Sequence, residues 1–208
     1  MSAYKKDLGK MYTYLRGRLD APGFEYSQQA LAFTRKTYKK FGLKRDGGED
    51  YFIHPLSMAC DAIAMKGVTD EMIAVILYHD LCEDCYVPLD ALPGNETIRR
   101  GVKYMTIRRF EDEEKYETKK RYYHELNESR EAVAGKGFDI IDNLTSMEGV
   151  FDEARIKKFI IEKHELYMPV LKEAKYEYPE LQDLFHTLRT NIGNLLKLMA
   201  RYHNVELS

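Results

Sequence analysis

The chain has 208 residues, of which 44% are hydrophobic and 32% charged, a composition typical of a folded globular protein and not of a disordered one. The formal net charge of -2, from 32 basic and 34 acidic residues, argues against a protein that coats nucleic acid. No signal-like apolar stretch follows the first charges and no run of 18 apolar residues occurs, so we expect neither secretion nor a membrane span. With three cysteines, a cytoplasmic protein with reduced thiols is the expectation.

Apolar residues recur at helical spacing along most of the chain, whereas the alternation typical of strands is scarce. In the first part, the pattern predicts helices over residues 5–19, from a Ser27 N-cap to about residue 41, from His54 to about Lys66, and over residues 70–85 after a Thr69 N-cap. Asp46-Gly47-Gly48 predicts a turn between two of them.

The second part of the chain continues this pattern. Helices are expected from Asn95 or Thr97 to Tyr104, within the polar segment 111–131, and over residues 132–147, 152–167 and 181–202. The sequence therefore predicts an all-α, single-domain bundle of seven to ten helices covering residues 1–208.

A cluster of polar groups interrupts the apolar helix over residues 70–85. His79-Asp80 ends the apolar run, and Glu83-Asp84 follows one turn later. Burying such groups is costly unless a metal ion or other partners compensate them. His54, at the start of the preceding helix, and Asp139, inside the apolar run 137–141, could supply the remaining ligands.

Mixed imidazole and carboxylate ligands suit Mn²⁺, Fe²⁺ or Zn²⁺ better than Ca²⁺. A buried histidine taken alone is more often a hydrogen-bonded core residue than a ligand. His54-Pro55 at a helix start, His-Asp-x-x-Glu-Asp and a later buried acid occur together here, and this combination favours a metal site. Cys82-x-x-Cys85 has no second cysteine pair, so a zinc or disulfide role is disfavoured.

Three segments carry a resemblance to a known family. They are Tyr51-Phe52-Ile53-His54-Pro55-Leu56, Tyr78-His79-Asp80-x-x-Glu83-Asp84 and Asp139-x-x-Asp142-Asn143-Leu144. Together they resemble the HD-domain metal-dependent phosphohydrolases, and most closely the hydrolase domain of the RelA/SpoT homologues and the stand-alone small alarmone hydrolases. The resemblance covers about residues 28–147, while residues 152–208 match only as generic helices.

The resemblance implies a role for each matching residue. His54, His79, Asp80 and Asp139 would bind one Mn²⁺, while Glu83 and Asp84 would activate the attacking water. The implied reaction removes the 3′-pyrophosphate from guanosine tetra- or pentaphosphate. The implied nucleotide contacts are Arg45, with Lys44 beside it, and Asn143, with Thr106 as a weaker candidate for lining the pocket. Tyr51 lies close to His54 in sequence, a position that suits either the pocket lining or the core.

The chain also departs from the family. Asp46 stands where a lysine is usual, Asp50 where a proline often precedes the tyrosine, and Asp142 where a histidine is common. Because acids near a tetra-anionic ligand repel it, the substrate could be another nucleotide, such as a nucleoside monophosphate or a dinucleotide cofactor phosphate. A catalytically silent nucleotide-binding module is the third interpretation. The expected partner is a small nucleotide, with no nucleic acid and no membrane, and homo-oligomerisation stays open.

Overall fold

The computed structural model describes residues 6–207, which fold into helices joined by turns and short 3-10 segments. The α-helices are α1 (Leu8–Leu19), α2 (Glu25–Phe41), α3 (Ile53–Ala62), α4 (Asp70–Tyr78), α5 (Leu81–Asp84), α6 (Glu96–Met105), α7 (Lys115–Glu125), α8 (Arg130–Ser146), α9 (Glu153–Glu162), α10 (Met168–Glu177) and α11 (Gln182–Tyr202). Within the described residues, extended pairing is limited to one antiparallel bridge between Lys44 and Asp50. The predicted all-α bundle is confirmed.

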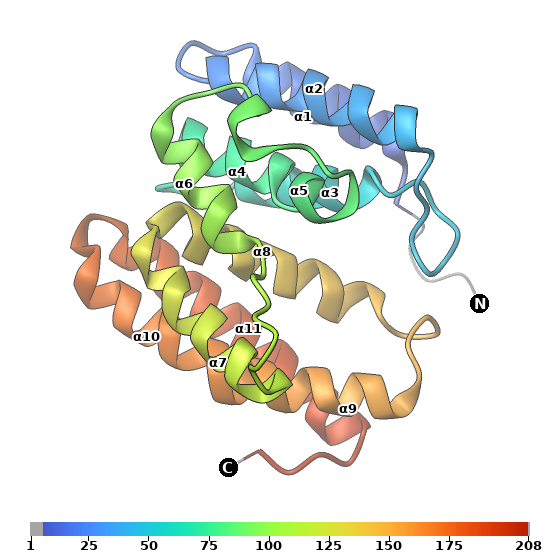
Figure 1. Ribbon diagram of the computed structural model, residues 1–208, viewed down its shortest axis with the longest axis vertical. Coiled ribbons are helices and arrows are strands. Elements are labelled where there is room, and N and C mark those ends of the chain that lie inside the picture. The colour runs from blue at the N-terminus through green and yellow to red at the C-terminus, as the bar shows by residue number, and fades with distance from the viewer. Residues whose placement is uncertain (1–5, 208) are drawn as a thin grey trace.

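Helix α8 runs through the middle of the molecule (Figure 1). It packs against α3, α4 and α6 on one side and against α10 and α11 on the other, while α2 covers α4. The side chains that α8 buries include Val133, Phe138 and Leu144, from successive turns. Two groups of helices thus share one core, and α8 can present residues to both.

Helix α4 lies inside this core. Every residue from Met72 to Tyr78 is buried, as expected for a helix that is apolar all round. Thr69 caps its start as predicted, since its hydroxyl accepts a hydrogen bond from the Met72 N–H. The predicted continuous helix to residue 85 is wrong, because α4 ends at Tyr78 and His79-Asp80 form a turn before the four-residue α5.

The start of α2 also differs from the prediction. Ser27 is not the N-cap, because the helix begins at Glu25. Instead, the Asp70 carboxylate accepts hydrogen bonds from the N–H groups of Tyr26 at 2.8 Å and Ser27 at 2.7 Å. The first turn of α4 therefore caps α2 across the interface between the two helices.

Three other helix boundaries differ from those that the sequence predicts. Residue 5 lies outside the described residues, and α1 begins at Leu8 after an Asp7 side-chain cap. The third helix ends at Ala62 instead of Lys66, shortly before Gly67 adopts a left-handed conformation with φ 88°. The predicted helix 152–167 becomes α9 and a π-helical turn, Lys163–Tyr167, which leads directly into α10.

None of the helices formed by residues 6–207 combines the length and apolar character needed to cross a bilayer.

Candidate metal centre

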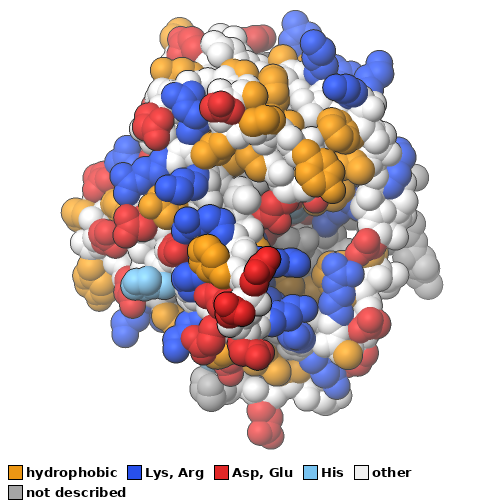
Figure 2. Space-filling model, in the orientation of Figure 1, with side chains coloured by type: hydrophobic (Ala, Val, Ile, Leu, Met, Phe, Trp, Pro, Cys, Tyr) orange, Lys and Arg blue, Asp and Glu red, His pale blue; other side chains and the backbone are white. Residues whose placement is uncertain are grey.

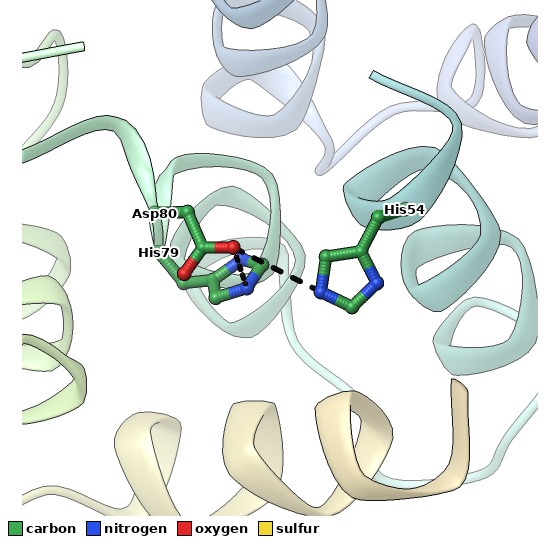
Figure 3. A group of neighbouring side chains, drawn as sticks. All are labelled: His54, His79 and Asp80. Carbon is green, nitrogen blue, oxygen red and sulfur yellow. Dashed lines mark ion pairs between the residues drawn. The ribbon is translucent and has the colours of Figure 1, made fainter. Parts of the chain in front are cut away.

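Two helix ends bring three of the predicted ligands together. His54 is the second residue of α3, and His79 and Asp80 directly follow α4, which packs against α3. Oδ2 of Asp80 lies 2.9 Å from Nε2 of His79 and 3.9 Å from Nε2 of His54. One ligand atom from each of the three residues lies within 4.8 Å of the other two, and Figure 3 shows both rings turned toward this carboxylate.

His79 has a nitrogen that the protein alone does not satisfy. Its Nδ1 lies 2.8 Å from the carbonyl oxygen of Ile76, so Nδ1 carries the proton because a carbonyl can only accept. In the neutral ring Nε2 is then a lone pair, and it is buried without a hydrogen-bond partner. Its closeness to the Asp80 carboxylate is favourable only with a cation between them, either a proton or a metal ion.

The charges around His79 agree with this geometry. Burial works to lower the pKa of His79, but the neighbouring Asp80 carboxylate outweighs it and raises the pKa. For Asp80, burial works to raise the pKa, and the two imidazoles outweigh it and lower the pKa. One positive charge, a proton or a metal ion, therefore stabilises the contact between His79 and Asp80.

His54 lies between two acids of α8. Its Nδ1 is 2.8 Å from Oδ2 of Asp142, and its Nε2 is 3.1 Å from Oδ1 of Asp139. Burial works to lower the pKa of His54, but hydrogen bonds with Asp139 and Asp142 outweigh it and raise the pKa to about 9. The Nε2 side faces His79 and Asp80, so this nitrogen points into the cluster.

Asp139 reaches the edge of the cluster. It contacts His54, but it is not part of the group whose ligand atoms all lie within 4.8 Å of one another. Its Oδ2 lies 2.7 Å from the ammonium of Lys136, and its Oδ1 accepts a hydrogen bond from the Asn143 amide at 2.7 Å. The structure thus brings together three of the four predicted ligands tightly and leaves Asp139 adjacent.

The donor set fits a divalent transition metal. Two imidazole nitrogens and a carboxylate oxygen suit Mn²⁺, Fe²⁺ or Zn²⁺. Ligands bound at about 2.1 Å put neighbouring donor atoms about 3.0 Å apart in octahedral and about 3.4 Å apart in tetrahedral geometry. The His79–Asp80 distance of 2.9 Å and the His54–Asp139 distance of 3.1 Å are close to these values, whereas His54 and Asp80, at 3.9 Å, would have to approach each other.

Glu83 and Asp84 lie on α5, directly after the cluster. Burial is the main reason why the pKa of each carboxyl is raised, with the negative charge of Asp80 adding to it. Oε1 of Glu83 accepts a hydrogen bond from the Ile107 N–H at 2.8 Å, so it ties α5 to the segment after α6. Oδ2 of Asp84 is buried without a hydrogen-bond partner.

Two of the predicted nucleotide contacts, Arg45 and Asn143, form a hydrogen bond with each other. The guanidinium of Arg45 donates to Asp142 at 3.1 Å, to the Asn143 side-chain oxygen at 3.3 Å and to the Ser146 hydroxyl at 3.3 Å. The loop that carries Arg45 therefore docks on the C-terminal half of α8, next to the cluster.

The other predicted contacts are engaged differently. Lys44 is exposed, with its ammonium 3.9 Å from Asp50. The Thr106 hydroxyl donates back to Val102 within its own helix end at 2.9 Å. The hydroxyl of Tyr51 donates to Asp80 at 2.9 Å, so Tyr51 holds a candidate ligand. Cys82 and Cys85 are free thiols.

Two further residues border Asp139 on α8: Lys136, which the sequence did not single out, and Asp142, which it marked only as a departure from the family. Lys136 precedes Asp139 by three residues and pairs with it, and Asp142 follows it by three and contacts His54. Residues three apart share a helix face, so their spacing around Asp139 was the signal available in the sequence.

One face of the molecule is hollowed. Figure 2 shows a hollow near the middle of that face, over α8 and between α5 and α9, rimmed by side chains of both charges. A separate pocket of about 600 Å³ lies between α7 and α9, and none of its lining residues belongs to the cluster.

Comparison with curated proteins finds a distant relative of this chain. No family model matches the chain. The chain is similar to the guanosine-3′,5′-bis(diphosphate) 3′-pyrophosphohydrolase of Aquifex aeolicus (strain VF5), with 28% identity over 198 residues. The matched region is 86% of this chain but 28% of the relative's length, so most of the relative has no counterpart here.

Proposed function

We propose that residues 1–208 form one HD-type domain and that the chain is a metal-dependent phosphohydrolase. The observation that carries the proposal is the buried, unpartnered Nε2 of His79 beside the Asp80 carboxylate, with Nε2 of His54 turned toward the same point. The similarity to the Aquifex pyrophosphohydrolase over most of the chain supports the same class. The proposed reaction is removal of the 3′-pyrophosphate from guanosine tetra- or pentaphosphate.

His54, His79 and Asp80 would hold the ion, with Asp139 as the fourth ligand after a small shift toward the cluster. Mn²⁺ is the proposed ion, with Fe²⁺ and Zn²⁺ as alternatives for the same donor set. When bound, such an ion lowers the pKa of a water molecule and offsets negative charge on phosphoryl oxygens.

Glu83 and Asp84 would take the proton from the attacking water. A general base works best when its pKa lies near the working pH, and burial raises the pKa of both carboxyls above their ordinary values. Oδ2 of Asp84 is buried without a hydrogen-bond partner, whereas Glu83 is engaged by the Ile107 N–H.

The nucleotide would lie over α8, in the hollow of Figure 2. Arg45 would contact phosphate, with Lys44 as a second cation at the loop, and Asn143 and Thr106 would line the pocket. Tyr51 would act on the substrate only indirectly, through its hydrogen bond to Asp80.

A second candidate is hydrolysis of a less charged nucleotide, such as a nucleoside monophosphate or a dinucleotide cofactor phosphate. One observation favours it: Asp142, Asn143 and Ser146 already accept hydrogen bonds from the Arg45 guanidinium. Fewer donors of Arg45 are then free for a phosphate-rich ligand.

A nucleotide screen tests the proposal. Purified protein is incubated with Mn²⁺ and a panel containing guanosine tetraphosphate, guanosine diphosphate, deoxynucleoside monophosphates and a phosphorylated dinucleotide, and pyrophosphate and orthophosphate are measured separately. Pyrophosphate release from guanosine tetraphosphate alone supports the first candidate, and orthophosphate release from another nucleotide supports the second.

The variant Asp80→Ala should abolish release, because it removes a ligand of the cluster. The matched control is Asp112→Ala, since Asp112 is an exposed acid in the loop before α7. Activity that survives Asp80→Ala, or that needs no divalent metal, would contradict a metal-dependent reaction at this cluster.

A further inference from the structure

Asp142 lies next to the candidate ligands and binds three groups that could carry a positive charge. Oδ2 accepts from Nδ1 of His54 at 2.8 Å and from Arg45 at 3.1 Å, and Oδ1 pairs with Lys6. Its side chain is 1% exposed, so the carboxylate reaches these partners away from solvent. Burial works to raise the pKa of Asp142, but His54 and Lys6 outweigh it and hold the pKa far below its ordinary range.

The chemistry of His54 decides what Asp142 does. A neutral imidazole has one N–H donor and one lone pair, and the nitrogen that binds a metal must be the lone pair. Nε2 is the nitrogen that faces Asp139, Asp80 and the ring of His79, whose centroid lies 5.2 Å from that of His54. When Nε2 binds a metal, the one remaining proton of the ring must therefore lie on Nδ1, and Oδ2 of Asp142 lies 2.8 Å from this nitrogen to accept it.

The two histidines reach this arrangement differently. For His79 the acceptor at Nδ1 is the backbone carbonyl of Ile76, which the fold supplies whatever the side chains are. For His54 the acceptor is a side chain, Asp142, placed by α8. The tautomer of His54 thus depends on a single replaceable residue.

We propose that Asp142 is a positioning residue that fixes the tautomer and orientation of His54 for metal binding. This inference rests on the proposed function for its metal, but the hydrogen bond itself does not require one. Because the same oxygen also receives Arg45, Asp142 joins the metal site to the loop that would contact phosphate.

Metal affinity and the state of the imidazole test the inference. Protein freed of metal is titrated with Mn²⁺ by calorimetry. Asp142→Ala should weaken binding about 10–100-fold, the usual effect of losing a partner that orients a ligand. Asp142→Asn keeps an oxygen that can accept from Nδ1, so it should restore most of the affinity.

Lys6→Ala is the matched control. It removes a partner of the other carboxylate oxygen and leaves the bond to His54, so metal affinity should stay within about twofold. If Asp142 merely ties the N-terminal segment to α8, both variants lower the melting temperature alike and neither changes the affinity, which overturns the inference.

A nuclear magnetic resonance measurement separates this inference from the proposed function. The Nδ1 proton of His54, assigned from its absence in His54→Gln, should exchange slowly in metal-free protein and quickly in Asp142→Ala. A wild type that binds Mn²⁺ but hydrolyses no nucleotide refutes the proposed function alone. A wild type that binds no Mn²⁺ also refutes it, and the exchange rate still decides whether Asp142 holds the ring; slow exchange in Asp142→Ala overturns the inference.

Discussion

Gly101, in α6, allows this helix to pack closely against α4, the helix that ends at the candidate metal centre. A Cβ atom at position 101 would lie 2.6 Å from Cγ2 and 3.2 Å from Cγ1 of Val75, and 3.3 Å from Cβ of Glu131. Valine is stiff in a helix because its branched Cβ strongly prefers one rotamer. The backbones of α4 and α6 must therefore separate to admit an alanine.

The variant Gly101→Ala sets two effects against each other. Overpacking a core typically costs about 1–3 kcal/mol, while replacing glycine by alanine inside a helix contributes about 1 kcal/mol of stability. The net change is then a loss of about 0–2 kcal/mol, and at about 2–4 °C per kcal/mol for a chain of this size the melting temperature falls by up to about 8 °C.

Gly17→Ala is the control, because Gly17 is an exposed residue of α1 and a Cβ atom added there would meet nothing within 4 Å. Only the helix propensity changes there, so the melting temperature should rise by about 2–4 °C. Both are measured by circular dichroism during heating. If Gly101→Ala is as stable as Gly17→Ala, the close packing of α6 on Val75 is not a constraint and the reasoning is refuted.

Three further predictions concern the cluster and the C-terminus. Tyr51→Phe removes the hydroxyl that donates to Asp80, so Mn²⁺ affinity by calorimetry should fall about tenfold; an unchanged affinity contradicts this role. Mn²⁺ at about 100 times its dissociation constant should raise the stability of the wild type by about 2.7 kcal/mol, seen as a higher melting temperature that a chelator reverses. Burial works to lower the pKa of His203, but hydrogen bonds with Glu148 and Glu153 outweigh it and raise the pKa. The contribution of protonated His203 to the free energy of unfolding is therefore complete below the unfolded pKa of about 6.5 and is lost as pH rises through the higher folded pKa. His203→Gln should thus destabilise by about 1 kcal/mol or less near pH 6, and by progressively less as the pH rises, as measured by denaturant unfolding.

The helices were predictable where local signals agree. Thr69 before α4 and Asn95 before α6 act as N-caps, as the sequence indicated. The start of α2 was not predictable locally, because Asp70 caps it from 43 residues further along the chain. Met168-Pro169 is typical of a helix end, since proline lacks an N–H; the π-helical turn before it lets the chain continue into α10.

The candidate metal centre, like the helices, was predictable from the sequence only in part. His54, His79 and Asp80 followed from motif spacing, and they do meet. The break after Tyr78 did not follow, because the apolar run gives no sign that the helix stops before His79. The contact between His54 and Asp142 joins residues 88 apart in sequence, and only the packing of α3 on α8 creates it.

Two acids that distinguish this chain from the family it resembles have basic partners in the fold. From the sequence alone, Asp46 and Asp50 are expected to repel a phosphate-rich ligand. In the fold, Asp46 lies 2.8 Å from Arg155 and Asp50 lies 3.9 Å from Lys44. Both pairs are exposed, and such pairs are worth only about 0–1 kcal/mol, so they soften the repulsion without removing it.

Asp142 has the larger consequence for substrate choice. It is buried and accepts from Arg45, so a phosphate must compete with a carboxylate and with Asn143 for the same guanidinium. A ligand with several phosphates needs more of the Arg45 donors and must displace Asp142 with the help of a further cation such as Lys44, whereas a ligand with one phosphate needs fewer of these donors. If guanosine tetraphosphate is the substrate, its binding must therefore loosen the Arg45–Asp142 pair, and the Asp142 carboxylate that positions His54 would respond to the nucleotide.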